Sequence, residues 1–542
     1  MTERWWGVAF AAVLLVEAML FVPFVGFNAD EVMFLGPLFP PHLCAVYWNS
    51  PLGHVPLMLM PYLGATKSLA YSWLVPLLPP GPVAVRLPVV LLSCVTLFLF
   101  LRLVSRVADR RTAIVATALL ATDTTFVLST SLDWGPAAVQ IFGWVLLASL
   151  AVRAVERPGV AVLAAAGFVA GFLVWNKAIF LFSLAGALVA AGIVFRDRIG
   201  RVRLRTILVL ACGFVVGSLP LVVFNAFSGM ATWRVRETLQ DYSPGFKIAA
   251  ATRTLDGSVF NGYMFVKSPA FRHDLLAVAL LASALVLPWA GADRRRRRLL
   301  QFAWITGLFT FLAMLPFRNA GAGPQHIVLL YPLPHLIIAA TFVSPGWLRK
   351  TGIWVVAAVL CAGALLTVAY RLQMSANGLS VYWTEAIYGL DRELRNERVT
   401  DVVAADWGIE EPVRALSEGR IRIVADRITA AALRENGGKN LRVVTHGDGF
   451  TLYPERLRTV EESARAAGVQ LVSAAQVMDA HGRVMFEVLS VGQDSIQSCG
   501  GVHAGLRSRT SGTALESRPT ITPALVPASP VRTAEPPSRK RR

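Results

Sequence analysis

The chain is poor in charged residues, and acidic residues are the scarcer kind. Charged residues make up 16% of the 542 residues, with 34 Asp and Glu against 52 Lys and Arg. An ordinary soluble globular protein is excluded, because about a quarter of the residues in such proteins are charged. Hydrophobic residues reach 55%, and the mean hydropathy is +0.55. This composition indicates a membrane protein.

Cysteine is also scarce, with five residues in the whole chain. Cys94, Cys212 and Cys361 lie inside apolar runs, while Cys44 and Cys499 are far apart in the sequence. This distribution fits neither a disulfide framework nor a metal site built from cysteines. No small-residue cleavage site follows the first apolar run, so we expect a retained helix and not a cleaved signal peptide.

Long apolar runs recur from Trp5 to Tyr370, with short polar breaks between them. A bilayer core takes about 20 apolar residues per helix, and the runs predict about eleven spans. The stretch from Leu57 to Tyr71 is apolar but too short to span, which favours an amphipathic helix along the interface. The predicted spans lie near residues 5–27, 84–101, 112–130, 136–152, 160–176, 178–195, 206–226, 274–291, 299–316, 326–343 and 352–370.

Positive charges gather in alternate breaks between the predicted spans. If the N-terminus faces the cytoplasm, every loop on that side is basic: "RLVSRVADRR", "RAVERPG", "RDRIGRVRLR", "GADRRRRR" and "PGWLRKTG". Lys and Arg stay on the cytoplasmic face. We therefore predict a multi-pass protein of the plasma (inner) membrane with a cytoplasmic N-terminus. The net charge of +18 then suits anionic lipid head groups, and no nucleic-acid partner is expected.

The hydrophobic period changes after Tyr370. Short apolar stretches, from "VTDVVAADW" to "RVMFEVLSV", alternate with helical ones and predict a small α/β domain. From about Gly492 onward Ser, Pro, Thr, Arg and Gly dominate, as in disordered tails. We expect a membrane domain over residues 1–370, an extracytoplasmic α/β domain over 371–491 and a disordered basic tail over 492–542.

Carboxylates stand at the outer ends of two predicted spans. Asp30 and Glu31 follow the first apolar run in "VPFVGFNADEVMF", and Asp133 ends the next outward run in "TDTTFVLSTSLDWGPAAVQ". A single acid at a membrane boundary is more often a solvated helix end than a catalyst. These acids, however, come from separate loops on one face, where they could converge. Glu17 falls near the middle of the first span, where an unpaired charge costs at least about 2.5 kcal/mol.

These motifs resemble those of the polytopic GT-C glycosyltransferases. The match is closest to bacterial members of the protein O-mannosyltransferase and lipid A aminoarabinose transferase superfamily. It rests on D-E after the first span, on "TDTTF" with "LDWGP", and on "GFLVWNKA" before the sixth span. "GFVVGSLPLVVFN", "GAGPQHIVLLYPLPH" and "VVAADWGI" fit as well, so the resemblance covers most of residues 1 to 410. The fold class it implies is an all-α polytopic membrane protein with the GT-C fold, followed by the small α/β domain.

The resemblance implies transfer of a sugar from a polyprenyl-phosphate donor to an acceptor hydroxyl on the outer face, with inversion. The first acid of the family's pair is the candidate catalytic carboxylate, and Asp30 matches it. Glu31 could orient the acceptor or hold Asp30 in place, since two close carboxylates do not both ionise freely. Asp133 matches the family's second acid, and together with His54 and Asn28 it is a candidate for binding acceptor or sugar. Asp133 could instead cap the fourth helix.

The leaving phosphate calls for cations or N–H donors where negative charge collects. Lys177, in "WNKAIF", is the first candidate, because its ammonium emerges on the outer face. A lysine that only snorkels to the interface is the alternative. Arg234, Arg236 and His326 are further candidates for the donor phosphate. Each of them could instead anchor a helix end.

No cofactor is predicted. His42 and His54 share the outer loop with the acidic pair, so a divalent ion is conceivable, but their spacing carries no ligand signature. A transporter or flippase is the main alternative class, and it would show paired halves with broken helices around a midplane site. No such repeat is readable. A sensor is a third class, but the C-terminal domain carries no ligand motif. The acceptor stays open between a protein, a lipid and a cell-envelope glycan.

Overall fold

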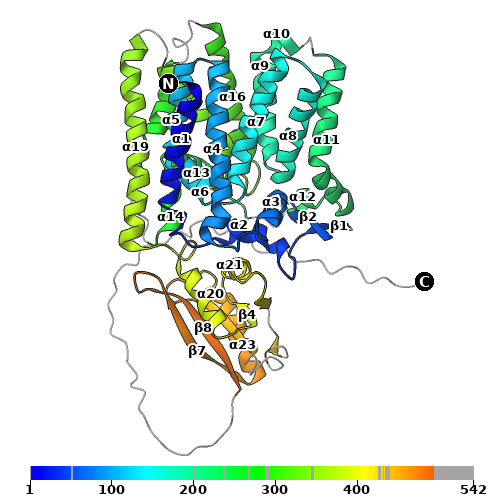
Figure 1. The fold of residues 1–542 in the computed structure, drawn as a ribbon, viewed down its shortest axis with the longest axis vertical. Helices are drawn as coiled ribbons and strands as arrows, with labels where there is room; N and C mark the ends of the chain where they lie inside the picture. The colour runs from blue at the N-terminus through cyan, green and yellow to red at the C-terminus, as the bar shows by residue number, and fades with distance from the viewer. Residues whose placement is uncertain are drawn as a thin grey trace, which may run out of the picture.

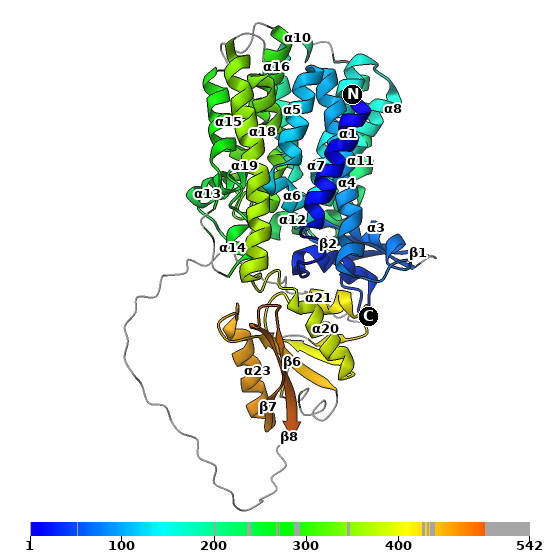
Figure 2. The same cartoon turned by 60° about the vertical axis from the view of Figure 1, so that its left-hand side comes forward.

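The computed structural model shows a bundle of helices with a smaller domain, built on a β-sheet, at one end (Figure 1). The turned view in Figure 2 keeps the same arrangement. Apart from residues 492 and 493, which end the last strand, the tail expected to be disordered lies outside the described residues. The structure describes residues 2–50, 53–199, 202–235, 240–266, 269, 271–286, 293–343, 347–424, 429–430, 433 and 440–493.

Each predicted span overlaps a helix of the bundle or a pair of helices that meet at a bend. By length and composition, four of the described helices could cross a membrane, or six if each of two bent pairs counts as one span. The expected number of about eleven stays a prediction. The helices are α1 (Glu3–Met19), α4 (Pro82–Val107), α5 (Arg110–Ala121), α6 (Thr124–Ser131), α7 (Ala137–Glu156), α8 (Val160–Asn176), α9 (Phe180–Val194), α11 (Leu204–Phe227), α15 (Leu275–Val286), α16 (Arg294–Met314), α17 (Pro324–Ile327), the 3-10 turn η3 (Val328–Leu330), α18 (Leu333–Phe342) and α19 (Trp347–Asn377).

Two of the expected spans are bent. The run over 112–130 turns by 63° between α5 and α6, and the run over 326–343 turns by 41° before α18. The first bend has a clear cause, because Asp123 starts a new helix by accepting a hydrogen bond from the Phe126 N–H at 2.7 Å. The other oxygen of Asp123 lies 3.2 Å from the Nε2 atom of His335 on α18, and this contact ties the two bends together.

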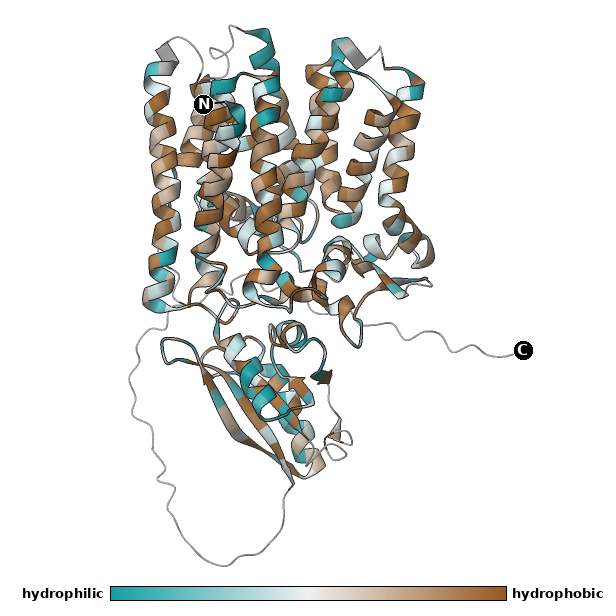
Figure 3. Cartoon of the chain, viewed as in Figure 1, coloured by the Kyte–Doolittle hydropathy of each residue, from teal (hydrophilic) through white to brown (hydrophobic). Residues whose placement is uncertain are grey.

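Basic breaks from different parts of the chain meet at the end of the bundle opposite the sheet domain. The first turn of α16 forms ion pairs with two of them, through Arg296 to Asp109 at 2.8 Å and through Arg298 to Asp197 in α10 (Arg196–Ile199) at 2.9 Å. Figure 3 shows hydrophilic residues at this end and apolar residues along the helices. Together with the pair between Arg106 and Glu156, these contacts join four of the five loops expected to share one face.

The sheet domain holds a mixed sheet of five strands in the order β5-β4-β6-β8-β7. The strands β5, β4 and β6 are parallel, and β8 runs antiparallel to both β6 and β7. The strands lie in the stretches from which strands were expected. The elements are α20 (Ala386–Asn396), β4 (Asp401–Ala404), α21 (Glu410–Leu416), β5 (Arg422–Val424), β6 (Leu441–His446), α23 (Pro454–Ala467), β7 (Val469–Met478) and β8 (Val484–Gln493).

The sheet domain and the loop after α1 share one hydrophobic core. Phe34 and Leu35, in the 3-10 helix η1 (Met33–Leu38), pack in a single buried cluster with Leu390, Val413 and Phe486 of the sheet domain. Burial of a large apolar side chain contributes roughly 1.5–3 kcal/mol. A shared core of this size fixes the sheet domain against the loop that carries the acidic pair.

The loop between α2 (Ala29–Val32) and α4 is partly sheet, and here the sequence prediction was wrong. Residues 57–71 were expected to form one amphipathic helix, but β1 (Val46–Ser50), β2 (Gly53–Met60) and β3 (Leu63–Gly64) pair antiparallel, and the helix α3 begins only at Thr66. The residues of β2 pair with the strands on either side of it, and this side-by-side packing overrides the preference that the apolar run shows by itself.

A buried ion pair joins this loop to the bundle. Arg86, near the start of α4, binds the Glu31 carboxylate through two hydrogen bonds of 2.5 and 2.7 Å, and both side chains are at most 1% exposed. Its remaining N–H groups donate to the carbonyls of Val22, Val25 and Gly26, just after α1. All five N–H groups of the guanidinium are therefore used.

We expect the Arg86→Met variant to lower the free energy of unfolding by about 3–5 kcal/mol, because it leaves the Glu31 carboxylate buried without its partner. The measurement is the unfolding of purified protein in detergent. Arg106→Met is a matched control on the same helix, since its ion pair with Glu156 spans 4.0 Å and both side chains are about half exposed. Loss of that surface pair changes stability by less than about 1 kcal/mol. Equal losses in the two variants would contradict the assignment.

Candidate active site

Asp30 lies in the single helical turn α2, at the end of the bundle that faces the sheet domain. Asn28 caps this turn: its Oδ1 accepts the Asp30 N–H at 2.9 Å, and its Nδ2 donates to the Tyr382 carbonyl at 3.1 Å. Glu31 completes a capping box by accepting the Asn28 N–H at 3.4 Å. Asn28, predicted as a binding residue, thus uses both side-chain groups to hold the backbone of the acidic pair.

The Asp30 carboxylate has one protein partner. Its Oδ2 accepts a hydrogen bond of 2.9 Å from Nε1 of Trp134, whereas its Oδ1 accepts none within the part of the chain that the structure describes. Burial raises the pKa of Asp30 above its ordinary value, and the Trp134 hydrogen bond and the Lys177 ammonium oppose that rise. Asp30 is therefore a buried acid with one oxygen held and one available.

Glu31 faces a different partner. Both of its oxygens are bound by Arg86, which leaves the carboxylate fully engaged within the protein. Of the two ways in which Glu31 was expected to act, this geometry favours holding Asp30 in place over orienting an acceptor.

Asp133 stands in the turn between α6 and α7 and is also engaged on both oxygens. Its Oδ1 accepts the Ala138 N–H at 2.9 Å at the start of α7, and its Oδ2 lies 2.5 Å from Nζ of Lys67. The helix cap that was the alternative expectation is therefore present. Both members of the Lys67–Asp133 pair are buried, and the Lys67 ammonium also lies 4.4 Å from the centre of the Phe34 ring.

Lys177 follows α8 directly, as the break in the sequence suggested. Leu63 of β3 forms a β-bridge with it, and its buried Nζ donates to the Gln325 carbonyl at 3.2 Å. A Cβ atom placed on Gly135 would lie 3.6 Å from this Nζ, so the ammonium sits against the turn that carries Asp133. Burial lowers the pKa of Lys177 to about 8, although Asp30 and Asp133 favour its charged form. Asp30, Asp133 and Lys177 thus come together.

The other predicted site residues divide between this place and other parts of the molecule. His326 is buried on α17, next to the carbonyl that binds Lys177, and its Nδ1 lacks a hydrogen-bond partner among the described residues. Arg234, in α12 (Ala231–Arg234), is exposed and donates to the Ser228 carbonyl. His54 is exposed on β2, with Nδ1 2.6 Å from Oδ1 of Asn49. Arg236 lies outside the described residues.

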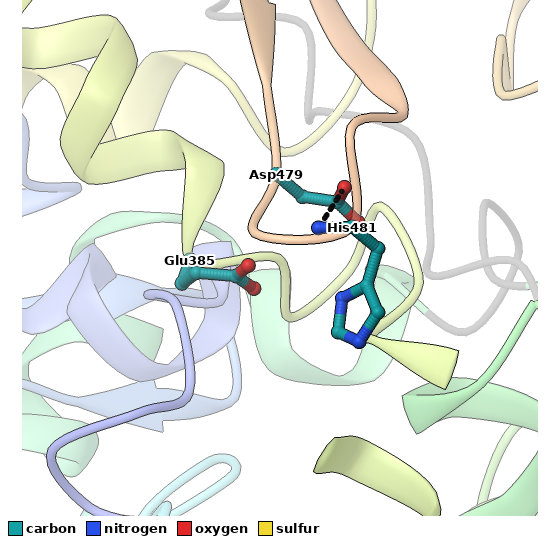
Figure 4. A group of neighbouring side chains, drawn as sticks. All are labelled: Glu385, Asp479 and His481. Carbon is teal, nitrogen blue, oxygen red and sulfur yellow. Dashed lines mark hydrogen bonds between the residues drawn. The ribbon is translucent and has the colours of Figure 1, made fainter. Parts of the chain in front are cut away.

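One group of side chains has the residue types of a metal site: Glu385, Asp479 and His481, shown in Figure 4. Each has a protein partner already. Glu385 accepts the N–H of residue 480 at 2.9 Å, Asp479 binds Arg483 at 2.5 and 2.7 Å, and Nε2 of His481 lies 3.0 Å from the Ser375 carbonyl. We assign a structural role to this group: its hydrogen bonds join the β7–β8 turn to the end of α19 and to Glu385, just before α20.

Comparisons with known proteins agree with the resemblance seen in the sequence. Residues 76–225 match the family described as dolichyl-phosphate-mannose-protein mannosyltransferase. ArnT from Cupriavidus metallidurans, solved with undecaprenyl phosphate and in the apo state, is similar in structure, with TM-scores of 0.55 and 0.57. The alignments cover 91% and 90% of this chain and 99% and 98% of ArnT, at 12% and 13% identity. No curated protein matches the chain.

The resemblance to the GT-C glycosyltransferases is confirmed. The likeness to ArnT, at 12% and 13% identity, shows a shared fold. The bundle of apolar helices described above is the GT-C fold of this multi-pass membrane protein.

Several residues of the candidate site were not predicted from the sequence. Lys67 interrupts an outer loop otherwise free of Lys and Arg, and Arg86 is a charged residue at the start of an apolar run. Both positions are unusual enough in the sequence to have indicated a buried partner. Trp134 stood inside a quoted motif. Glu411 carried no signal: its helix α21 packs against α2, and burial, Glu410 and Asp30 raise the pKa of Glu411 to about 7. The sheet domain thus brings a further carboxyl group towards Asp30.

We expect Gly135→Ala to lower the free energy of unfolding by about 1–2 kcal/mol. Gly135 has φ 58°, in the left-handed region that costs an L-residue roughly this much. Gly192→Ala on α9 is the matched control, because a Cβ atom there meets open space. In a helix the change from Gly to Ala favours folding by up to about 1 kcal/mol. Unfolding curves of the purified variants test this, and a Gly135→Ala protein as stable as the wild type would contradict the turn geometry.

Proposed function

We propose that the protein transfers a sugar from a polyprenyl-phosphate donor to an acceptor hydroxyl, with Asp30 as the general base and inversion at the anomeric carbon. One observation carries this proposal: a buried carboxylate lies beside the buried cation Lys177, with one oxygen held by Trp134 and the other without a hydrogen-bond partner among the described residues. An acid and a cation are what the acceptor and the leaving phosphate each require.

The acceptor attacks one face of the anomeric carbon, and the phosphate leaves from the other. An acceptor hydroxyl is a poor nucleophile at neutral pH, so Asp30 takes its proton as the oxygen bonds to the anomeric carbon. The bond from that carbon to the phosphate oxygen breaks on the opposite face, which inverts the configuration. A positioned general base contributes about 10²–10⁴ to the rate. Its raised pKa brings Asp30 closer to the working pH and makes it a better base.

Lys177 is proposed to bind the donor phosphate. The described residues give its ammonium one hydrogen bond, to Gln325, so two of its three N–H groups are available to phosphate oxygens. Buried His326 lies next to Gln325 and could add a donor. ArnT, which shares the fold, was solved bound to undecaprenyl phosphate, and this supports a lipid phosphate as the donor. Arg234 is kept as a weaker candidate.

The site is proposed to face the outside of the plasma membrane, with the N-terminus and the basic loops in the cytoplasm. Support comes from the basic breaks, which meet at the end of the bundle opposite Asp30 and the sheet domain (Figures 1 and 3). An extracytoplasmic sheet domain follows from this orientation, and about eleven spans, the number predicted from the apolar runs, are part of the proposal. The acceptor is a protein, a lipid or a cell-envelope glycan.

We expect Asp30→Asn to lower kcat for sugar transfer by at least about a hundredfold, because the amide cannot take the acceptor proton. The assay follows release of polyprenyl phosphate from a panel of polyprenyl-phosphate sugars by purified protein with cell-envelope acceptors. Glu410→Gln is the control, since this acid on the neighbouring helix is paired with Arg414 at 2.6 Å. Undiminished transfer by Asp30→Asn would rule out the base. Movement of the lipid across vesicle membranes, equal in both variants and without transfer, would favour a flippase.

We expect the KM for the donor to rise as the pH passes about 8, because Lys177 loses its proton there and its charge no longer binds the phosphate. Lys177→Met should show a high KM that does not change near pH 8, at least about tenfold above the wild-type value at pH 6. Lys177→Arg should keep the low KM and lose the rise near pH 8, since arginine stays charged beyond about pH 12. Initial rates against donor concentration from pH 6 to 10 provide the measurement. A rise near pH 8 that persists in Lys177→Arg would assign it to another group.

A further inference from the structure

Trp134 is the one side chain in the described part of the protein that donates a hydrogen bond to Asp30. It reaches Asp30 from the α6–α7 turn, more than a hundred residues away in the sequence. The indole is 6% exposed, so its Nε1–H bond to Oδ2 is sheltered from water. A hydrogen bond to a carboxylate is stronger when it is sheltered from water than when it is exposed to solvent.

The indole ring is held by other aromatic rings. Tyr263 meets it edge to face with 4.5 Å between ring centres, and Trp383 does so at 6.0 Å. Phe260 packs against it at 5.9 Å. Such contacts fix the plane of the ring as well as its place. The direction of the Nε1–H bond is therefore set before any substrate arrives.

The backbone that carries Trp134 is held as well. Asp133, just before it, has a φ angle of 43°, which residues other than glycine seldom adopt. Gly135, just after it, has a φ angle of 58°, which glycine adopts readily. The Lys67–Asp133 ion pair and the hydrogen bond from the N–H of Ala138 lock the first of these residues. The buried Lys67–Asp133 pair is thus the support of the turn that presents the indole.

We propose that Trp134 is a positioning residue, which holds Oδ2 of Asp30 so that Oδ1 is aimed at the proton of the acceptor hydroxyl. The role of Asp30 as base rests on the proposed function, whereas the effect of the indole on the carboxylate does not. The Lys67–Asp133 pair then acts one step further back, through the turn.

A donated hydrogen bond favours the charged form of Asp30, so its removal raises the pKa of this acid. The other groups that face Asp30 are Lys177, Tyr62 and Tyr263, and Glu411 from the sheet domain. On the elements packed against α2, Glu31 is neutralised by Arg86, Asp133 by Lys67 and Glu410 by Arg414. None of these pairs involves Trp134, so the loss of its N–H leaves them in place.

The kinetic test compares Trp134→Phe with Trp383→Phe. Both lose an indole from the same aromatic cluster, but Nε1 of Trp383 has no hydrogen-bond partner among the described residues. We expect Trp134→Phe to move the acidic limb of kcat upward by about one pH unit and to lower the plateau about tenfold, with the KM for the donor unchanged. Trp383→Phe keeps an aromatic ring against Trp134 and removes no hydrogen bond to Asp30, so it should leave the limb where it is. A Trp134→Phe limb at the wild-type pH would overturn the proposal.

A second measurement does not depend on turnover. A hydrophobic carbodiimide modifies protonated buried carboxyl groups, and mass spectrometry of the peptide that contains Asp30 gives the modified fraction at each pH. We expect the midpoint to rise by about one pH unit in Trp134→Phe. The midpoint could shift in Trp134→Phe while Asp30→Asn still transfers sugar. That combination would contradict the role of Asp30 as base and would support the effect of the Trp134 hydrogen bond on the carboxylate. An unmoved midpoint would sink the role of Trp134 alone.

If Trp134→Phe fails to fold, 3-benzothienylalanine at position 134 replaces it. This residue keeps the shape of the indole and has sulfur in place of the N–H group, so packing against Tyr263 and Phe260 is preserved. The same residue at position 383 is the control. A midpoint that rises at 134 and stays at 383 supports the positioning role, and equal midpoints at both positions overturn it.

Discussion

The candidate site depends on the buried ion pair between Glu31 and Arg86. A guanidinium with five N–H groups gathers one carboxylate and three carbonyls, and so fastens the end of α1, the turn α2 and the start of α4 at one point. Buried pairs of this kind add little net stability, because both charges lose their water. Their effect is geometric: the pair holds the turn α2 in one position, and Asp30 is therefore held in one position too.

Two adjacent acids thus have separate tasks. Glu31 is saturated by a strong partner, while Asp30 receives one neutral hydrogen bond and faces a lysine across the site. Asp133, like Glu31, is paired with a buried cation, Lys67. In this site the fully paired acids hold the backbone, and the partly paired acid is the one that we propose as the base. The same division applies to the cations, since Arg86 is fully bonded and Lys177 is not.

The sheet domain is part of the site's construction. Its core is continuous with the loop after α1, and its helix α21 packs on α2. Hydrogen bonds to Glu385 and to the Ser375 carbonyl join its β7–β8 turn to the chain around the end of α19. It also brings Glu411 towards Asp30. Any molecule that approaches Asp30 from this end of the bundle therefore meets the sheet domain as well as the helices.

The sequence by itself determined the membrane class, the positions of the apolar helices, the acidic pair and Lys177, because hydropathy and motifs are local properties. It could not show that residues 46–60 pair as strands, that Asp123 bends a span, or that Arg86 and Lys67 neutralise Glu31 and Asp133. The ion pairs and the Asp123–His335 contact join groups 55 to more than 200 residues apart, and the hairpin depends on pairing between two strands. Which acid stays unpaired is decided only when the folded chain has brought every partner into place.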